Sequence, residues 1–331
     1  MNNKVAIVTG ITGQDGAYLS KFLIENDYKV FGLIRDTTKP NLSNLEYLCI
    51  KDGLELVKSN LIDLSNLLRV IDKIKPDEIY HLAAQSSVGL SFNQPIWTLE
   101  FNLLSTANIL EAVRIAKPDT RFYHASSSEM YGNIEKEELP IKEDMRVHPS
   151  SPYGISKASS HWLAINYREA YNVFASCGIL FNHESVLRGN EFVTKKIIET
   201  AFNISEGKAD QLIVGNINIL RDWGYAPEYV KSMWKILQLE KADDFIICSG
   251  EAHSLEEFIM KVFKFFDLDY NKYVKVDESL FRPNELNIIY GDNSKAKEVL
   301  GWDYDMDFDD LINALVKDHI EYHNFKSVGK I

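Results

Sequence analysis

The sequence contains little cysteine and no long apolar run. Its three cysteines, Cys49, Cys177 and Cys248, stand far apart, and this number and spacing are not typical of a disulfide framework or a zinc site. The eight histidines form no H-E-x-x-H or similar ligand pair, so we predict no metal. No apolar stretch approaches the roughly twenty residues that a membrane-spanning helix needs, and the apolar run near the N-terminus is too short for a secretory signal. We therefore expect a soluble, cytoplasmic protein that does not enter a membrane.

Positive charge is also scarce. The chain has 36 Lys and Arg residues against 48 Asp and Glu residues, and its formal net charge is -12. Nucleic-acid binding needs a concentrated positive face, so we do not expect a nucleic-acid partner. Hydrophobic residues make up 45% and charged residues 25% of the 331 residues, which is ordinary globular composition and long enough for one large or two moderate cores.

The N-terminal segment "VTGITGQDGAYLSKFL" places three glycines, Gly10, Gly13 and Gly16, directly after a short β-branched run. The following residues show helical spacing, and a second apolar run at 28–34 reads as a strand. Any strand-to-helix connection favours glycine, so a simple tight turn is one interpretation. The surrounding strand–turn–helix–strand pattern favours a dinucleotide-binding βαβ unit, whose helix N-terminus holds a diphosphate.

Strand and helix patterns alternate through the first half of the chain. Strands are predicted near 4–9, 28–34, 54–58, 77–83, 120–126 and 173–181, with helices near 15–26, 61–74 and 94–117 and a further long helix that includes "HWLAINYREAY". Alternation of this kind predicts an α/β fold with a doubly wound parallel sheet. We assign residues 1–181 to this Rossmann domain, with a returning strand near 244–250, and residues 182–331 mainly to a smaller α/β substrate domain.

Tyr153 and Lys157 are four residues apart at the start of a predicted long helix, so their side chains share one face. An ammonium beside a phenol stabilises the phenolate, so we expect Lys157 to lower the pKa of Tyr153 and make it a usable base. A surface Tyr–Lys pair is the plainer alternative. The position of the pair after a nucleotide-binding pattern favours the catalytic interpretation.

Ser127, Ser128 and Glu129 follow a predicted strand, at the edge where doubly wound folds bind their ligands. The serines are also consistent with a helix cap or a turn. Glu129 is the more informative residue. Oxidation of a sugar alcohol needs a hydroxyl donor, a tyrosine and a lysine, whereas removal of a proton beside the resulting ketone needs an additional base such as a carboxylate.

Eight segments then make the sequence resemble an extended short-chain dehydrogenase/reductase and, more narrowly, a GDP-mannose 4,6-dehydratase. In order they are "TGITGQDG", "HLAAQSSVGLSF", "SSSEMYG", "SPYGISK", "FNHES", "RDWGYAPEYV", "RPNEL" and "GDNSKAKEVLGW". The resemblance runs from residue 4 to about residue 320. It implies that Ser127 polarises the sugar oxygen, Tyr153 takes the C4 hydroxyl proton, Lys157 tunes Tyr153 and touches the nicotinamide ribose, and Glu129 handles the C5 proton.

The resemblance also implies two sets of binding residues. The cofactor-binding set comprises Gly10, Thr12, Gly13, Gln14, Asp15, Gly16, Arg35, Asn60, Leu61, Leu82, Ala83, Ala84, Ser86, Tyr153, Lys157, His183 and Arg188. The substrate-binding set comprises Ser87, Ser127, Glu129, Asn182, Val193, Lys196, Arg221 and Arg282. Arginine beside aromatic and proline residues is typical of fixed, bidentate phosphate contacts, which fits a GDP-sugar, although ordinary surface ion pairing is an alternative for any one cation.

The sequence departs from this family at several positions. Where the family has two arginines for the adenosine 2′-phosphate, this chain has Arg35 followed by Asp36, so we expect NADP, with NAD as the alternative. Serines stand at 87 and 150 in place of a histidine and an arginine, and the segment 185–189 has lost one arginine. These changes surround the expected sugar pocket and leave GDP-mannose and GDP-manno-heptose both open.

We therefore expect a GDP-sugar 4,6-dehydratase that oxidises C4, eliminates water across C5 and C6, and returns the hydride to C6. A nucleotide-sugar 4-dehydrogenase, reductase or epimerase would use Tyr153 and Lys157 without Glu129, and a non-enzymatic nucleotide sensor would not be expected to retain Tyr153 and Lys157. The loop after Arg35, "DTTKPNLSNLEYL", is about as long as the family loop that reaches a neighbouring subunit. The resemblance thus implies a homotetramer or homodimer.

Overall fold

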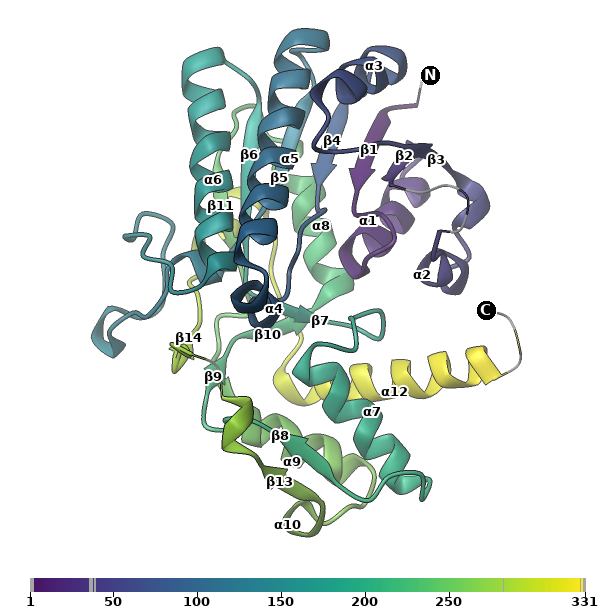
Figure 1. Cartoon of the computed structure of the whole chain (residues 1–331), viewed down its shortest axis with the longest axis vertical. Coiled ribbons are helices and arrows are strands. Elements are labelled where there is room, and N and C mark those ends of the chain that lie inside the picture. The colour runs from purple at the N-terminus through teal and green to yellow at the C-terminus, as the bar shows by residue number, and fades with distance from the viewer. Residues whose placement is uncertain (1–2, 36–37, 39, 282, 328, 330–331) are drawn as a thin grey trace.

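The computed structural model describes residues 3–35, 38, 40–281, 283–327 and 329 of the chain. Its main sheet has seven strands in the order β11-β6-β5-β4-β1-β2-β3, all paired in parallel. The strands are β1 (Val5–Thr9), β2 (Lys29–Ile34), β3 (Leu54–Lys58), β4 (Glu78–His81), β5 (Arg121–Ser127), β6 (Ala175–Leu180) and β11 (Asp244–Ile247). The predicted doubly wound parallel sheet is confirmed, and it fills the upper half of Figure 1.

Helices cover both faces of this sheet. On one face α3 (Leu64–Ile74), α5 (Pro95–Ala116) and α6 (Pro152–Tyr171) pack beside one another, and on the other α8 (Ala226–Leu237) packs between α1 (Gln14–Glu25) and α11 (Ser294–Leu300). The expected helices near 15–26, 61–74 and 94–117 are confirmed. The second begins three residues later than expected because Asp63 caps it, its carboxylate accepting from the backbone N–H of Asn66 at 3.0 Å.

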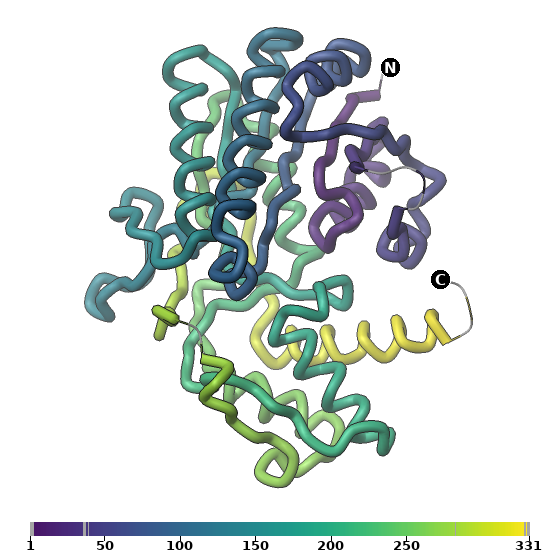
Figure 2. Tube along the Cα trace, in the orientation of Figure 1, coloured from purple at the N-terminus to yellow at the C-terminus, as the bar shows by residue number. Residues whose placement is uncertain are grey.

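The lower half of the molecule is built around three longer helices, α7 (Val193–Ser205), α9 (Leu255–Phe265) and α12 (Phe308–Ser327). Figure 2 shows the C-terminal helix α12 lying beside α7. Short strand pairs complete it: β7 (Asn182–Glu184) with β10 (Trp223–Tyr225), β8 (Leu212–Val214) with β13 (Val274–Val276), and β9 (Leu220–Arg221) with β12 (His253–Ser254) and β14 (Ile288–Ile289). Its core is rich in aromatic side chains, among them Phe258, Phe263, Trp223 and Phe308.

Short elements connect these parts. The short α-helices are α2 (Ser43–Tyr47), α4 (Val88–Asn93) and α10 (Tyr270–Tyr273), and the 3₁₀ turns are η1 (Lys51–Gly53), η2 (Ser128–Met130), η3 (Lys136–Glu138) and η4 (Glu278–Leu280). None of the helices in the described part of the chain is both long and apolar enough to cross a membrane.

Residues beyond 181 contribute α8, β11 and α11 to the layers of the main sheet. An ion pair anchors β11, because the Arg168 guanidinium of α6 donates to both carboxylate oxygens of Asp244 at 3.1 and 2.7 Å. The same carboxylate accepts from the backbone N–H of Cys177 in β6 at 3.0 Å. A bidentate, half-buried pair of this kind specifies where the returning strand docks.

The strand expected at 244–250 ends at Ile247, because Ser249 and Gly250 hydrogen-bond to Asp222 outside the main sheet. The buried carboxylate of Asp222, between β9 and β10, accepts hydrogen bonds from the backbone N–H and hydroxyl of Ser249 at 2.8 and 2.7 Å. It also accepts from the N–H of Gly250 at 3.0 Å. Burial raises the pKa of Asp222 to about 6, although these hydrogen bonds act in the opposite direction. Asp222 therefore ties the end of β11 to the strand that carries Arg221.

The glycine turn after β1 is required by close backbone contacts. Gly10 has a φ of +68°, in the left-handed region that disfavours other residues, and a Cβ there would lie 2.9 Å from the backbone N of Ala83. A Cβ at Gly16, in the first turn of α1, would lie 2.2 Å from the carbonyl oxygen of Gly10. The turn therefore depends on glycine at 10 and 16 for the packing of α1 against β1 and β4.

Replacing Gly16 by alanine tests this close packing. The added Cβ forces the backbone of Gly10 or Ile11 to shift, and overpacking of this kind costs roughly 1–3 kcal/mol. We expect the free energy of unfolding of Gly16→Ala, measured by urea denaturation, to fall by that amount. Gly89→Ala in α4 is the control, since outside its chain neighbours and its own helix backbone no described atom lies within 4 Å of its Cβ position. Equal losses in the two variants would contradict the explanation.

Candidate functional site

Two adjoining cavities open at the edge of the main sheet where the strands end. The tyrosine cavity, around Tyr153 and Glu129, holds about 160 Å³, and the glycine-turn cavity, around residues 10–16, holds about 530 Å³. Their shared walls are formed by Asp15, Leu82, Ala84, Ser86, Arg188, Glu191 and Phe192. A ligand in one cavity therefore lies next to a ligand in the other.

Most of the residues predicted from the sequence line these cavities. The tyrosine cavity receives Ser87, Ser127, Glu129, Tyr153, Lys157, Asn182, His183, Val193 and Arg221. The glycine-turn cavity receives Gly10, Thr12, Gly13, Gln14, Gly16, Arg35, Leu61 and Ala83, in addition to the shared residues. Segments from across the chain thus converge on one edge of the sheet.

The structure does not bring two of the predicted residues, Lys196 and Asn60, into either cavity. Lys196 is exposed on α7, and its Nζ donates to the carbonyl oxygen of Ile213 at 2.7 Å. The side-chain oxygen of Asn60 accepts from the backbone N–H of Ile62 at 3.3 Å, while its neighbour Leu61 lines the glycine-turn cavity. Arg282 lies outside the described residues.

The tyrosine cavity also has walls that sequence reasoning missed. Glu184, Thr194 and Trp223 line it, and Ser59 and Trp97 line the glycine-turn cavity. Ser59, Glu184 and Thr194 each adjoin a residue that was predicted, which is the only local signal. Aromatic residues such as Trp97 gave no signal, because the same pattern also predicts a core position on a helix.

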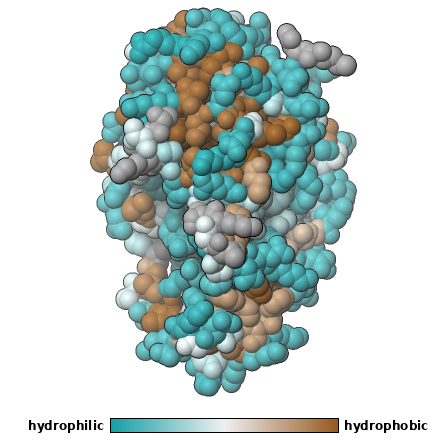
Figure 3. Space-filling model, turned by 90° about the vertical axis from the view of Figure 1, so that its right-hand side faces the viewer, coloured by the Kyte–Doolittle hydropathy of each residue, from teal (hydrophilic) through white to brown (hydrophobic). Residues whose placement is uncertain are grey.

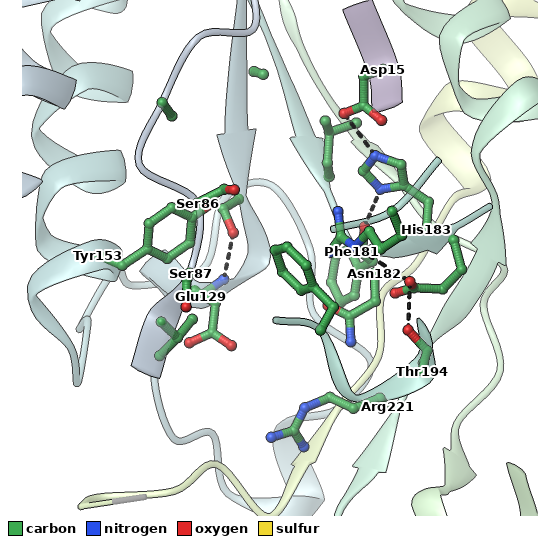
Figure 4. A pocket seen from close by; sticks show the side chains of 18 of the residues that line it. Asp15, Ser86, Ser87, Glu129, Tyr153, Phe181, Asn182, His183, Thr194 and Arg221 are labelled. Atoms are coloured by element: carbon green, nitrogen blue, oxygen red, sulfur yellow. Dashed lines mark hydrogen bonds and ion pairs between the residues drawn. The ribbon is translucent and has the colours of Figure 1, made fainter. Parts of the chain in front are cut away.

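Tyr153 and Glu129 face the same space from different elements. Ser151 caps α6, its hydroxyl accepting from the N–H of Gly154 at 3.0 Å, and this places Tyr153 in the first turn with only 8% of its surface exposed. The Ser127 hydroxyl at the end of β5 hydrogen-bonds with Tyr153 and accepts from the N–H of Glu129 at 3.3 Å. Figure 4 shows Tyr153 and Glu129 on one side of the cavity, with Asn182 opposite and Arg221 reaching in from β9.

The expected effect of Lys157 on Tyr153 is not what the structure shows. Burial raises the pKa of Tyr153 to about 12, the charge of Glu129 acts in the same direction, and Ser127 and Arg188 oppose it. The Nζ of Lys157 donates to the carbonyl oxygen of Ala125 at 2.7 Å and lies 5.9 Å from the centre of the Tyr153 ring. Burial lowers the pKa of Lys157 itself to about 8. The expectation of a lowered Tyr153 pKa is therefore wrong, because burial outweighs the neighbouring charges.

An acid–histidine pair connects the two halves of the site. The carboxylate of Asp15, in α1, lies 3.0 Å from Nε2 of His183 in β7, and Nδ1 of His183 donates to the carbonyl oxygen of Phe181 at 2.7 Å. Burial alone would raise the pKa of Asp15, but His183 lowers it to about 2. Burial likewise opposes the charged form of His183, yet Asp15 raises its pKa above the ordinary value. Asp15 is therefore ionised near neutral pH, and its charge favours the protonated form of His183.

Two arginines contribute positive charge to the tyrosine cavity. Arg221 is 5% exposed, and one of its nitrogens donates to the carbonyl oxygen of Leu220 at 2.9 Å. The guanidinium of Arg188 lies 3.7 Å from the centre of the Phe192 ring, and its Nε lies 3.3 Å from a carboxylate oxygen of Glu184. Planar guanidinium groups held in this way suit the oxygens of a diphosphate. Within the described part of the chain, no group of three or more potential ligands is placed to hold a metal ion.

The Asp15–His183 pair makes a prediction about ionisation. In Asp15→Asn the charge that raises the His183 pKa is lost, while burial and Arg188 still lower it, so this pKa must fall relative to the unsubstituted protein. Side-chain NMR of the histidines during a pH titration measures the shift. His81, whose pKa burial and Lys157 lower to about 3, serves as the internal control and must not change. An unaltered His183 titration would refute the pairing.

The pair also has a predicted effect on stability. Because the folded-state pKa of Asp15 lies at about 2, below its ordinary value of 3.8, its ionised form stabilises the fold above about pH 4. That stabilisation is lost as the pH falls toward 2. Asp15→Asn should therefore show a smaller loss of stability over this range than the unsubstituted protein.

Comparisons with known proteins agree with this geometry. A model of the family "GDP-mannose 4,6 dehydratase" matches residues 7–315. GDP-mannose 4,6 dehydratase 2 of Arabidopsis thaliana is 44% identical over 328 residues, covering 96% of this chain and 87% of the relative. Among solved structures, a Streptomyces venezuelae dTDP-glucose 4,6-dehydratase with NAD bound superimposes with a TM-score of 0.85 at 22% identity, covering 97% of this chain and 98% of the other.

A UDP-glucose 4-epimerase of Thermotoga maritima has the same TM-score, 0.85, at 21% identity, and the match covers 96% of this chain and 99% of that one. The fold is therefore shared by dehydratases and epimerases, and only the sequence relationship assigns this chain to one family. The family match along most of the chain shows that this protein belongs to the GDP-mannose 4,6-dehydratase family.

Proposed function

We propose that this protein dehydrates a GDP-sugar, GDP-mannose or GDP-manno-heptose, to the GDP-4-keto-6-deoxy sugar, using NADP. The observation that carries the proposal is the position of Glu129 in one buried cavity with Tyr153, Lys157 and Ser127, beside a cavity suited to a dinucleotide. The family relationship supports the same reaction class, a hydro-lyase.

The glycine-turn cavity fits a dinucleotide. Gly13 precedes the first residue of α1, and no side chain at this position hydrogen-bonds to the helix N-terminus. The first backbone N–H groups of α1 are therefore available to a diphosphate. Gly10 and Gly16 keep side chains out of this turn. When bound, the nicotinamide cofactor supplies a reversible hydride acceptor, and the residues that would hold it are those of the turn, together with Leu61, Ala83 and Arg35.

The protein's own residues handle the protons. Tyr153 is the group that would accept the proton of the C4 hydroxyl, with the Ser127 hydroxyl hydrogen-bonded to it. Because its pKa is about 12, Tyr153 would act as a base once the positively charged ring of an oxidised nicotinamide lies beside it and lowers that pKa. Oxidation at C4 acidifies the C5 proton, which Glu129 removes, and the protonated Glu129 then assists departure of the C6 hydroxyl as water. Lys157, on the same helix face as Tyr153 and buried, holds its ammonium against the Ala125 carbonyl and would contact the ribose of the nicotinamide cofactor.

Arg221, Arg188 and Asn182 are the groups that we assign to the GDP diphosphate. All three line the tyrosine cavity, and the buried position of Arg221 limits the conformational entropy lost on binding. We propose that residues 182–331 mainly form this sugar-nucleotide half. The small side chain of Ser87, which caps α4 through the N–H of Leu90 at 3.2 Å, leaves space for either a hexose or a heptose.

NADP is our choice of cofactor because of Arg35. It lies at the end of β2, is exposed, and lines the glycine-turn cavity, where a guanidinium suits a 2′-phosphate. Asp36, which would oppose this charge, lies outside the described residues. NAD, which the Streptomyces neighbour carries, is the alternative.

The reaction is tested by incubating the protein with GDP-mannose or GDP-manno-heptose and either NADP or NAD, and weighing the product by mass spectrometry. We expect a product lighter by one water, without net cofactor reduction, and faster turnover with NADP. Net reduction of the cofactor would indicate a 4-dehydrogenase, and an unchanged mass with altered sugar stereochemistry an epimerase. Clear preference for NAD would refute the cofactor choice alone.

Glu129→Gln separates elimination from oxidation. Glutamine keeps the shape and hydrogen-bonding capacity but removes the base, so the overall rate should fall by roughly 10²–10⁴-fold. In a single turnover with NADP-loaded protein, reduced cofactor and a 4-keto sugar that has not lost water should accumulate. Tyr153→Phe is the matched variant and should stop the first hydride transfer, forming no ketone. Normal water loss and normal deuterium incorporation at C5 in Glu129→Gln would overturn the assignment.

We also propose that the protein is a homodimer or homotetramer. The family loop on which this expectation rests includes residues 36–37 and 39, which lie outside the described residues. Independent support comes from apolar side chains exposed along α5 and α6, where Ile96 is 74%, Trp162 56% and Ile155 43% exposed. Adjacent helices with such side chains suit a second copy of the chain.

Light scattering at micromolar concentration measures the assembly. We expect a dimer or tetramer, and Trp162→Glu should shift it toward the monomer because a charge would be buried in the interface. A monomeric mass for the unsubstituted protein would contradict the proposal.

We further propose a cytoplasmic location, which suits the free thiols of Cys177 and Cys248.

A further inference from the structure

A third cavity, lined by basic side chains, lies between α7, α12 and the segment 185–190. This basic cavity holds about 130 Å³. It shares Asn44, Leu187 and Arg188 with the glycine-turn cavity but none of the catalytic residues. It is therefore a neighbour of the proposed active site and not a part of it.

The charge of the basic cavity is unbalanced. Arg188, Lys195 and Lys326 line it together with the imidazoles of His319 and His323. One carboxylate, Glu199, also lines it, and Arg188 is paired with Glu184. Among the ion pairs of the described residues, none includes Lys195, His319, His323 or Lys326. In a chain with a net charge of -12, cations gathered without carboxylate partners indicate an anionic ligand.

Two of these groups are buried, which makes the imbalance costly without a ligand. Lys195 is 7% exposed, and its Nζ donates to the carbonyl oxygen of Val186 at 2.8 Å, which leaves further N–H donors. His319 is 6% exposed, and its Nδ1 is buried without a hydrogen-bond partner. A buried ring nitrogen left unpaired beside a cavity is a group that a ligand can satisfy.

The pKa values of His319 and Lys195 are both lowered, in part by the positive charges around them. Burial, together with the charges of Lys195, His323 and Lys326, lowers the pKa of His319 to about 4. Burial also lowers the pKa of Lys195 to about 8. The charge of Glu199 acts to raise this pKa, and the charge of Lys326 acts to lower it. An anion placed among them would raise both pKa values.

We propose that the basic cavity binds a phosphate group, either free inorganic phosphate or the terminal phosphate of a small metabolite, through Lys195, His319 and Lys326. The small volume favours a phosphate group over a whole nucleotide. Three donors from two helices can surround a tetrahedral oxyanion, and the amide of Asn190 lies at the same wall. This binding does not depend on the proposed reaction.

The position of the site gives the bound anion a structural effect. Tyr47 of α2 packs edge-on against Tyr322 of α12, with ring centres 4.8 Å apart. The basic cavity therefore lies where α2 meets the C-terminal helix α12. Figure 3 shows that the side of the molecule where α2 and the end of α12 lie carries many hydrophilic side chains together with a hydrophobic patch in its upper half. An anion here joins α7 to α12 and stabilises the folded protein by mass action.

Calorimetric titration of the full chain with inorganic phosphate at constant ionic strength tests the proposal. The unsubstituted protein should bind phosphate saturably. Lys195→Met, which keeps the side-chain length, and Lys326→Ala, at an exposed position, should each weaken that affinity by about tenfold or more. Lys208→Ala is the control, because it removes an exposed cation beyond the end of α7 that is paired with Glu206. It should change the affinity by less than about twofold.

Two further measurements locate the anion. When phosphate is added, the pKa of His319 measured by NMR should rise. Arg221→Ala, in the tyrosine cavity, should leave the phosphate affinity of the basic cavity unchanged. Titration with glucose 6-phosphate distinguishes a terminal phosphate from free phosphate. Absence of saturable binding, equal affinity in Lys195→Met and Lys208→Ala, or loss of binding only in Arg221→Ala would overturn the proposal.

Discussion

The arrangement of the site depends on one buried carboxylate, that of Asp222. Burying a charge is costly unless hydrogen bonds replace water, and the backbone and hydroxyl of Ser249 and the N–H of Gly250 supply them. These donors follow β11, in the main sheet, whereas Asp222 itself belongs to the segment between β9 and β10. The bonds therefore hold the two halves of the molecule in one relative position, and with them Arg221, the residue before Asp222, at the floor of the tyrosine cavity.

The Asp15–His183 pair performs a similar task at the other wall. It joins the glycine turn to β7 across 168 residues of sequence, and Gln14 strengthens it by donating to both the Asp15 carboxylate and the carbonyl oxygen of His183 at 2.9 and 3.0 Å. A dehydratase that oxidises and then reduces the same sugar needs its two ligands at a constant separation through the cycle. The Asp15–His183 pair, in which Asp15 lies in the shared wall and His183 lines the tyrosine cavity, is suited to that requirement.

Charge is distributed unevenly in this acidic protein. Arginines are placed in the tyrosine cavity and at the mouth of the glycine-turn cavity, and Lys195 of α7 and Lys326 of α12 line the basic cavity. Local positive potential in cavities of an otherwise negative molecule attracts phosphorylated ligands to those positions and not to the surface as a whole. The three cavities are linked by Arg188, which lines each of them.

The sequence by itself determined the elements whose signals are local. The β-branched run, the glycine turn and the helix that follows were predictable, because Gly10 and Gly16 are required by backbone geometry within one turn. Tyr153 and Lys157 share a helix face because of their spacing, and Ser127 and Glu129 lie at a strand end because strands and helices alternate. Only the tertiary structure decided the rest. It turned Lys196 away from the cavity, paired Asp15 with His183, raised the Tyr153 pKa and assembled the basic cavity. Burial and charge pairing depend on segments far apart in the chain, and a linear pattern carries no information about the distance between them.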